Sequence, residues 1–204
     1  EDFMFWKLDK LASQGYLAFG VDMFGAGRAL WDKEEALAAR KPLREDRSQM
    51  IERMMCAYET ACSMEVADSA RVGAIGYCFG GMAVLDLARS GLPKSLKATV
   101  SLHGILDRLD TPPTDVVGKV LVCHGGSDPF VTPEMLRDFE SDMAARNAED
   151  LHIHTYSGSK HAFTRPEKTT EGDSAAGLYY CELADAASWA AASALLDSCL
   201  RQTA

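Results

Sequence analysis

The sequence has no excess of positive charge and no long apolar run, and each absence excludes a class of protein. Its 21 Lys and Arg residues stand against 30 Asp and Glu residues, which gives a formal net charge of −9. Because phosphate binding needs a basic surface, this balance disfavours nucleic acid as a partner. The longest stretch without Asp, Glu, Lys or Arg, residues 72–85, is too short to cross a bilayer. We therefore expect neither nucleic acid nor a membrane as partner.

Zinc-type C-x-x-C pairs are also missing, although the chain has 6 cysteines. An even number would allow disulfides, but a chain this long, with 47% hydrophobic residues, does not need them to fold. We expect most of the cysteines to be small buried residues, and the protein to occupy a reducing compartment, the cytoplasm. His152 and His154 share one face of an expected strand, but no third metal ligand is indicated, so a half-exposed strand is favoured over a metal site.

What the sequence does contain is the composition and the pattern of one α/β domain over residues 1–204. Short apolar runs predict strands at residues 16–23, 71–78, 98–103, 119–124 and 151–156. Helical spacing predicts helices at residues 2–13, 50–58, 82–88, 134–145 and 175–200. Because strands alternate with helices, we expect right-handed crossovers and a mostly parallel sheet with helices on both faces.

A cysteine lies in a glycine-rich turn between an expected strand and an expected helix. The segment Gly76-Tyr-Cys78-Phe-Gly80 is typical of a nucleophile elbow, with Cys in the place usually held by Ser. Side chains two residues to either side would collide in so sharp a turn, so Gly76 and Gly80 fit it. The N-terminus of the following helix favours a thiolate and a developing oxyanion. A buried Cys in a close-packed crossover is the alternative, and the strand–turn–helix context disfavours it.

An acid and a histidine follow in the order that such a nucleophile needs. Asp128 comes after the strand expected at 119–124, and His161 comes after the strand expected at 151–156. Both therefore lie at the carboxyl edge of a parallel sheet, where ligands bind. Singly, Asp128 could cap a loop and His161 could be a surface residue. Together they predict a triad in which His161 takes the proton of Cys78 and Asp128 fixes the imidazole tautomer.

These motifs resemble the dienelactone hydrolase family of α/β-hydrolases, whose nucleophile is also a Cys in a G-x-C-x-G elbow. The resemblance runs along the whole chain, through Gln14-Gly-Tyr16, Val21-Asp-Met-Phe-Gly25, the elbow, Gly126-Ser-Asp128-Pro-Phe-Val131, His161-Ala-Phe163 and Ser188-Trp189. It implies an α/β-hydrolase fold and hydrolysis of a small-molecule ester or lactone through an acyl-cysteine, without a metal or an organic cofactor. A general carboxylesterase without preference for dienelactones and a catalytically idle binding protein on the same fold are the alternatives.

The resemblance also suggests residues that bind the substrate. In the dienelactone-cleaving members arginines hold the substrate carboxylate, and Arg165 falls where one of them would lie. An ordinary surface charge is the alternative for Arg165. Arg28 lies near the position of the other arginine, two residues away from it. Tyr77, His103 and Phe130 are further candidates for substrate binding. His103 and His124 both end expected strands, and packing or a role in a turn is the equally plausible alternative for each.

The front of the chain departs from the family pattern. Family members carry a first set of strands, and then a loop whose Glu helps to deprotonate the Cys and whose N–H completes the oxyanion hole. Counted back from Gly15, that Glu would lie before residue 1, so Glu1 does not match it. The resemblance therefore implies one oxyanion donor in this sequence, the N–H of Phe79, and a domain without its N-terminal strands.

Overall fold

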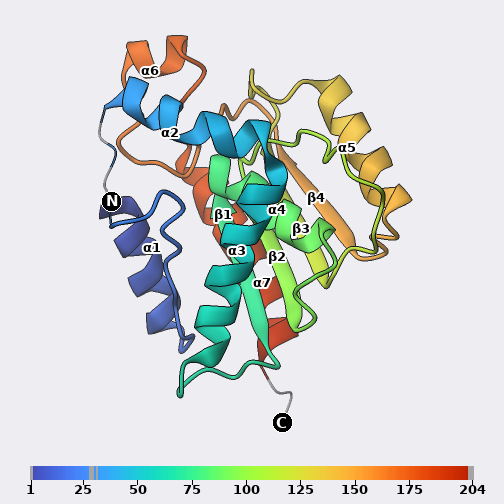
Figure 1. Cartoon of the computed structure of the whole chain (residues 1–204). Coiled ribbons are helices and arrows are strands. Elements are labelled where there is room, and N and C mark those ends of the chain that lie inside the picture. Colours follow the sequence, from blue (N-terminus) through green and yellow to red (C-terminus); the bar gives the residue numbers. More distant parts are fainter. Residues whose placement is uncertain (1, 28–29, 31, 202–204) are drawn as a thin grey trace. The chain divides into compact units, whose positions relative to one another are not determined.

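The computed structural model describes residues 2–27, 30 and 32–201, and the chain divides into two compact units, residues 1–69 and 70–204 (Figure 1). The described part of the first unit is helical and consists of α1 (Asp2–Ser13), α2 (Lys33–Glu45) and α3 (Arg47–Ser63). Asp46 ends α2 and begins α3, because its carboxylate accepts the N–H groups of Ser48 and Gln49. The helix expected around residues 50–58 is thus confirmed as part of α3, whereas α2 was not expected.

Residues 16–23 do not form the strand that their apolar run predicts. They carry no strand pairing, and the side chains of Leu17, Phe19 and Val21 remain about two-fifths exposed. A buried strand needs neighbours that satisfy its backbone N–H and C=O groups. The described residues of the first unit contain no other strand that supplies them. This prediction was wrong because apolar composition does not encode a pairing partner.

The second unit is built on a parallel sheet. Its strands are β1 (Val72–Tyr77), β2 (Leu96–Leu102), β3 (Lys119–Gly125) and β4 (Leu151–Tyr156). The described residues give one 4-stranded sheet of order β1-β2-β3-β4, in which every neighbouring pair is parallel. This confirms the expected parallel sheet, and it brings the carboxyl ends of all the strands to one edge.

Helices cover both faces of this sheet. The covering helices are α4 (Phe79–Arg89), α5 (Pro133–Ala145) and α7 (Glu182–Leu200), and the short helix α6 (Glu171–Ala175) lies in the connection between β4 and α7. Figure 1 shows α4 in front of the strands and α7 behind them. On the α4 and α5 face, Leu85 and Phe139 pack with Val120 and Val122 of β3 in one buried apolar cluster. No helix in the described part of the chain is both long enough and apolar enough to span a bilayer.

The segment expected as one helix at residues 175–200 is interrupted. Residues 177–179 run beside His161, which donates its N–H to Gly177 O and accepts the N–H of Tyr179. These hydrogen bonds replace those of a helix, so α7 begins only at Glu182. The expected burial of most cysteines was also wrong. All six thiols are free, but Cys123 alone is fully buried, because most of the others lie on partly exposed helix faces or at helix ends.

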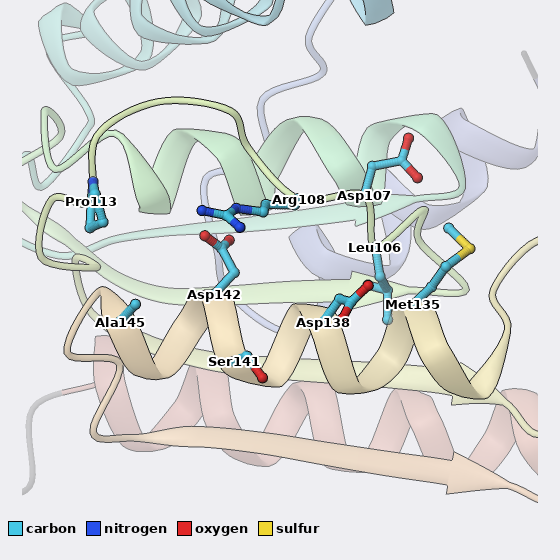
Figure 2. A pocket seen from close by; sticks show the side chains of 9 residues that line it. All are labelled: Leu106, Asp107, Arg108, Pro113, Met135, Asp138, Ser141, Asp142 and Ala145. Carbon is cyan, nitrogen blue, oxygen red and sulfur yellow. The ribbon is translucent and has the colours of Figure 1, made fainter.

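The crossover from β2 to β3 contains neither helix nor strand. Residues 103–118, all of which the structure describes, run irregularly over α4 and α5. Between this crossover and α5 lies a cavity of about 420 Å³, into which Arg108 and Asp142 point from opposite walls (Figure 2). Parallel neighbours are usually joined through a helix, whose backbone groups satisfy one another. An irregular crossover needs other donors for its carbonyls.

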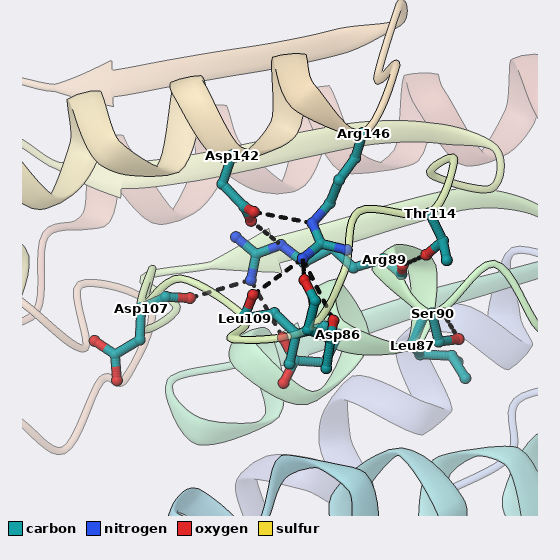
Figure 3. Close-up of polar contacts among 10 residues, drawn as sticks. Asp86, Leu87, Arg89, Ser90, Asp107, Leu109, Thr114, Asp142 and Arg146 are labelled. Carbon is teal, nitrogen blue, oxygen red and sulfur yellow. Dashed lines mark hydrogen bonds and ion pairs between the residues drawn. The ribbon is translucent and has the colours of Figure 1, made fainter.

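Buried ion pairs supply those donors (Figure 3). Arg89 and Arg146 are 0% and 1% exposed, and both pair with Asp142 of α5, at 3.1 and 2.9 Å. Asp86 is a second partner of Arg89, at 3.2 Å. The same guanidinium groups donate to crossover carbonyls, Arg89 to Asp107 and Arg146 to Leu109 and Thr111. The charges therefore fasten the crossover to α4 and α5.

We expect Asp142→Asn to lower the free energy of unfolding by about 3 kcal/mol, because it leaves a buried guanidinium without its counter-charge. Denaturant unfolding followed by circular dichroism measures the change. Glu134→Gln is the matched control, since Glu134 lies on the same helix and pairs with Arg137 in solvent. Equal stability of the two variants would contradict a structural role for the buried cluster.

Candidate active site

Cys78 stands in a strained turn at the carboxyl end of β1. Its backbone has φ 54° and ψ −117°, a left-handed conformation that side chains rarely adopt. The turn is fixed on both sides, because the N–H of Cys78 donates to Leu102 O and its carbonyl accepts the N–H of Met82. Such strain persists only where the surroundings hold it, and it is common at functional sites. The strand–turn–helix that the G-x-C-x-G pattern predicts is therefore present.

The glycines in and beside this turn differ in whether the structure leaves room for a side chain. A Cβ on Gly76 would lie 2.1 Å from Gly80 O, a distance that no side chain tolerates. A Cβ on Gly80 would meet nothing within 4 Å, so the predicted steric need for glycine holds at Gly76 and is wrong at Gly80. The second tight position is Gly81, whose Cβ would lie 2.6 Å from Ser101 Oγ. Close packing of α4 on β2, rather than the elbow itself, explains that glycine.

Asp128 and His161 meet at the same edge of the sheet. Asp128 follows β3, His161 follows β4, and Asp128 Oδ2 lies 2.8 Å from His161 Nδ1. Both side chains are buried, with 0% and 4% of their surface exposed. The other carboxylate oxygen of Asp128 accepts the N–H of Phe130 at 2.8 Å. The carboxylate is thus held from two directions and orients the imidazole.

The imidazole of His161 also hydrogen-bonds the side chain of Cys78. Because Nδ1 faces Asp128, the nitrogen that faces the sulfur is Nε2. Burial alone would lower the pKa of His161, but the hydrogen bonds to Asp128 and Cys78 and their charges raise it to about 9. Asp128 and Cys78 are therefore both partners of the His161 imidazole, and both favour its protonated form.

Aromatic rings lie around His161. The ring of His103, which follows β2, lies 5.0 Å from the ring of His161. Nε2 of His103 lies 2.9 Å from Thr164 Oγ1. The ring of Phe130 contacts His161 edge to face at 5.1 Å and is 43% exposed. Tyr77 is buried against His103, and this burial raises the pKa of its hydroxyl. Of the three, Phe130 offers the most surface to a substrate.

The predicted arginines and oxyanion donor have different surroundings. Arg165 is part exposed and ion-paired with Glu167. Arg28 lies outside the described residues. Phe79 is the first residue of α4, so its N–H belongs to the positively polarised end of that helix, next to Cys78. Within the part of the chain that the structure describes, no group of three or more His, Cys, Asp or Glu side chains could hold a metal ion.

His124 ends the strand expected at residues 119–124, so its place beside the site follows from the sequence. Burial lowers the pKa of His124, which also senses the charges of Asp128 and His161. Three other residues near the site were not expected from the sequence. Thr164 holds His103, and Gly177 anchors the backbone of His161. Lys160 precedes His161 directly and faces the segment around Ser174. Only their nearness to the motifs in the chain could have drawn attention to them, because none belongs to a pattern.

Comparison with known proteins shows which family the sequence and the structure resemble. The model of the dienelactone hydrolase family matches residues 4–200. A crystal structure of a dienelactone hydrolase-like promiscuous phosphotriesterase from metagenomic libraries is 30% identical, with a TM-score of 0.86 over 94% of this chain and 78% of that one. A solved structure named m3DLH is 34% identical, with a TM-score of 0.83 and the same coverage. An uncharacterised protein of Caenorhabditis elegans is 30% identical over 68% of this chain and 87% of its own length.

We expect the imidazole of His161 to stay protonated through neutral pH and to titrate near pH 9. In Asp128→Asn the midpoint should fall, because burial then dominates. Since the folded pKa lies above the ordinary value of 6.5, this proton stabilises the fold fully below pH 6.5, and the contribution is lost as the pH rises through 9. Nuclear magnetic resonance of the ring, assigned with a His161→Gln variant, gives the midpoint. A midpoint at or below 6.5 in the unsubstituted protein would overturn this expectation.

Gly177→Ala should destabilise the protein more than Gly158→Ala. Both glycines have positive φ, +81° and +77°, so each change costs about 1 kcal/mol of backbone strain. A Cβ on Gly177 would also lie 2.3 Å from Pro129 Cγ, whereas a Cβ on Gly158 meets nothing within 4 Å. This overpacking should cost roughly 1–3 kcal/mol more. Urea unfolding of the two variants compares them, and equal losses would argue against a tight contact beside Asp128.

Proposed function

Because the chain belongs to the dienelactone hydrolase family, we propose that it hydrolyses a small-molecule ester or lactone with Cys78 as the nucleophile. Hydrolysis of ester or lactone bonds follows from the family; the covalent route through sulfur is our proposal. One observation carries it: the His161 ring bridges Cys78 and the buried carboxylate of Asp128 at the carboxyl edge of the sheet. A thiol, a base and an acid in this order are what nucleophilic acyl transfer requires.

In the first half of the reaction the sulfur of Cys78 attacks the carbonyl carbon. His161 holds the thiol proton as an imidazolium, which the raised pKa favours at neutral pH. The carbonyl oxygen becomes an oxyanion, which the N–H of Phe79 and the positive end of α4 stabilise. The C–O bond of the ester then breaks, and His161 passes its proton to the leaving alkoxide. The product is an acyl-cysteine and a free alcohol.

In the second half water restores the enzyme. The imidazole of His161, now neutral, takes a proton from a water molecule that attacks the acyl carbon. The C–S bond breaks, the carboxylic acid leaves, and sulfur and imidazolium return to their starting state. Asp128 keeps Nδ1 protonated throughout, so that Nε2 alone exchanges protons. One ester and one water thus give one acid and one alcohol.

Two classes of substrate fit this mechanism: a lactone that bears a carboxylate, and a neutral ester. Arg165, to which the resemblance assigns a substrate carboxylate, is already paired with Glu167, so an acidic substrate would compete with that carboxylate. Comparing the hydrolysis rates of acidic and neutral esters separates a dienelactone hydrolase from a general carboxylesterase.

Cys78→Ala should lower ester hydrolysis by about a thousandfold or more while the circular dichroism spectrum stays unchanged, because the nucleophile is lost but the fold is not. In the unsubstituted protein, mass spectrometry of rapidly quenched reactions should find the acyl group on the peptide that contains Cys78. Undiminished turnover by Cys78→Ala would refute the proposal.

Iodoacetamide supplies the matching control. Cys78 should be alkylated faster than the other thiols, because the imidazolium of His161 stabilises its thiolate. By contrast, burial raises the pKa of Cys123 to about 11 and keeps that thiol protonated. Cys56→Ala, which removes an exposed thiol on α3, should leave the turnover rate unaltered. A protein whose Cys78 reacts no faster than Cys56 would instead be a binding protein that retains the fold.

A further inference from the structure

A second hollow lies directly beside the candidate triad. Its volume is about 390 Å³, enough for a substituted ring, and its walls include Pro129, Phe130, Lys160, Ser174 and Gly177. Pro129 follows Asp128 in the chain and Lys160 precedes His161. The ring of Phe130 lines this pocket and also contacts the imidazole of His161, so it connects the two.

Lys160 is the positive charge of the pocket. Its Nζ donates to the carbonyl and to the hydroxyl of Ser174, at 2.8 Å each, which uses two of its three N–H groups. Among the described residues, no carboxylate lies within ion-pair distance of Lys160. Two neighbouring cations differ in this respect, because Lys168 pairs with Asp173 and Arg165 pairs with Glu167. The charge of Lys160 is therefore not neutralised by a protein carboxylate, and its third N–H group is available to an anion.

The chemistry of the site indicates which part of a substrate would reach this pocket. His161 gives its proton to the leaving oxygen, so the leaving alcohol must lie against the imidazole. Phe130 packs on that ring and also lines the pocket. A ring carried by the leaving oxygen can stack beside Phe130 and extend toward Lys160. The acyl group, which is bonded to Cys78, is directed away from the histidine.

We propose that this pocket binds an anionic group, a carboxylate or a similar small anion, on the leaving alcohol of the substrate, and that Lys160 is its ligand. The inference rests on the proposed function, because it uses the proton transfer from His161. It assigns anion recognition to Lys160 rather than to Arg165, whose guanidinium is already ion-paired.

Two esters that differ only in the charge of the leaving group test the proposal. These are 4-acetoxybenzoate and 4-acetoxybenzamide, compared by the ratio of their kcat/KM values. Lys160→Met should lower the ratio of anionic to neutral substrate about tenfold, and Lys160→Arg should restore most of it. Any general effect on the triad acts on both esters and cancels in the ratio. Lys168→Met removes the same charge from the same segment, and it should leave the ratio as it is.

A binding measurement separates this proposal from the proposed function. Calorimetric titration with 4-hydroxybenzoate, the product, requires no turnover, and Lys160→Met should weaken its binding about tenfold. A kcat/KM ratio and a product affinity that both survive Lys160→Met would overturn the proposal. So would a ratio that collapses in Arg165→Met and not in Lys160→Met. Full activity of Cys78→Ala on both esters would instead refute the nucleophile, and the affinity for 4-hydroxybenzoate would still decide the pocket.

Discussion

Burying a carboxylate and an imidazole together costs free energy, and in this fold only their mutual hydrogen bond and their neighbours offset that cost. Asp128 and His161 are almost fully enclosed, yet they come from loops after different strands. Their contact exists because β3 and β4 are adjacent and parallel, so that both loops leave the sheet at the same edge. The imidazole then lies within reach of Cys78, which a third strand supplies. The proton transfer that we propose at the sulfur thus depends on the register of the sheet.

A second set of buried charges stabilises the fold beneath this edge. Asp142 joins the ends of α4 and α5 through Arg89 and Arg146, and the guanidinium groups hold the carbonyls of an irregular crossover. That crossover begins at His103, whose ring lies against His161. The same helix, α4, begins next to Cys78, the proposed nucleophile, and ends in the charged cluster. Fixing one end of α4 therefore also steadies the turn that presents Cys78.

The sequence predicted those parts whose pattern is local. Apolar runs such as residues 119–124 identified strands, and residues after strand ends converge in any parallel sheet, which is why Asp128 and His161 were found. Pairing between distant segments was not predictable. Residues 16–23 are apolar, but the described residues of their own unit offer no strand beside them. The helix expected from residue 175 gives way where the chain pairs with His161. The sequence does not set Lys160 apart from other surface lysines, because its distinguishing feature is that no carboxylate of the described residues forms an ion pair with it.

The backbone of His161 is tied to Gly177 and Tyr179, so the intervening residues form an excursion whose two ends are pinned together. The length and composition of that excursion can change without displacing the imidazole, since loop closure depends only weakly on loop size. Ser174, on the wall of the neighbouring pocket, belongs to this excursion. Substitutions or insertions in this excursion can therefore reshape the pocket beside Phe130 while the imidazole of His161 keeps its position.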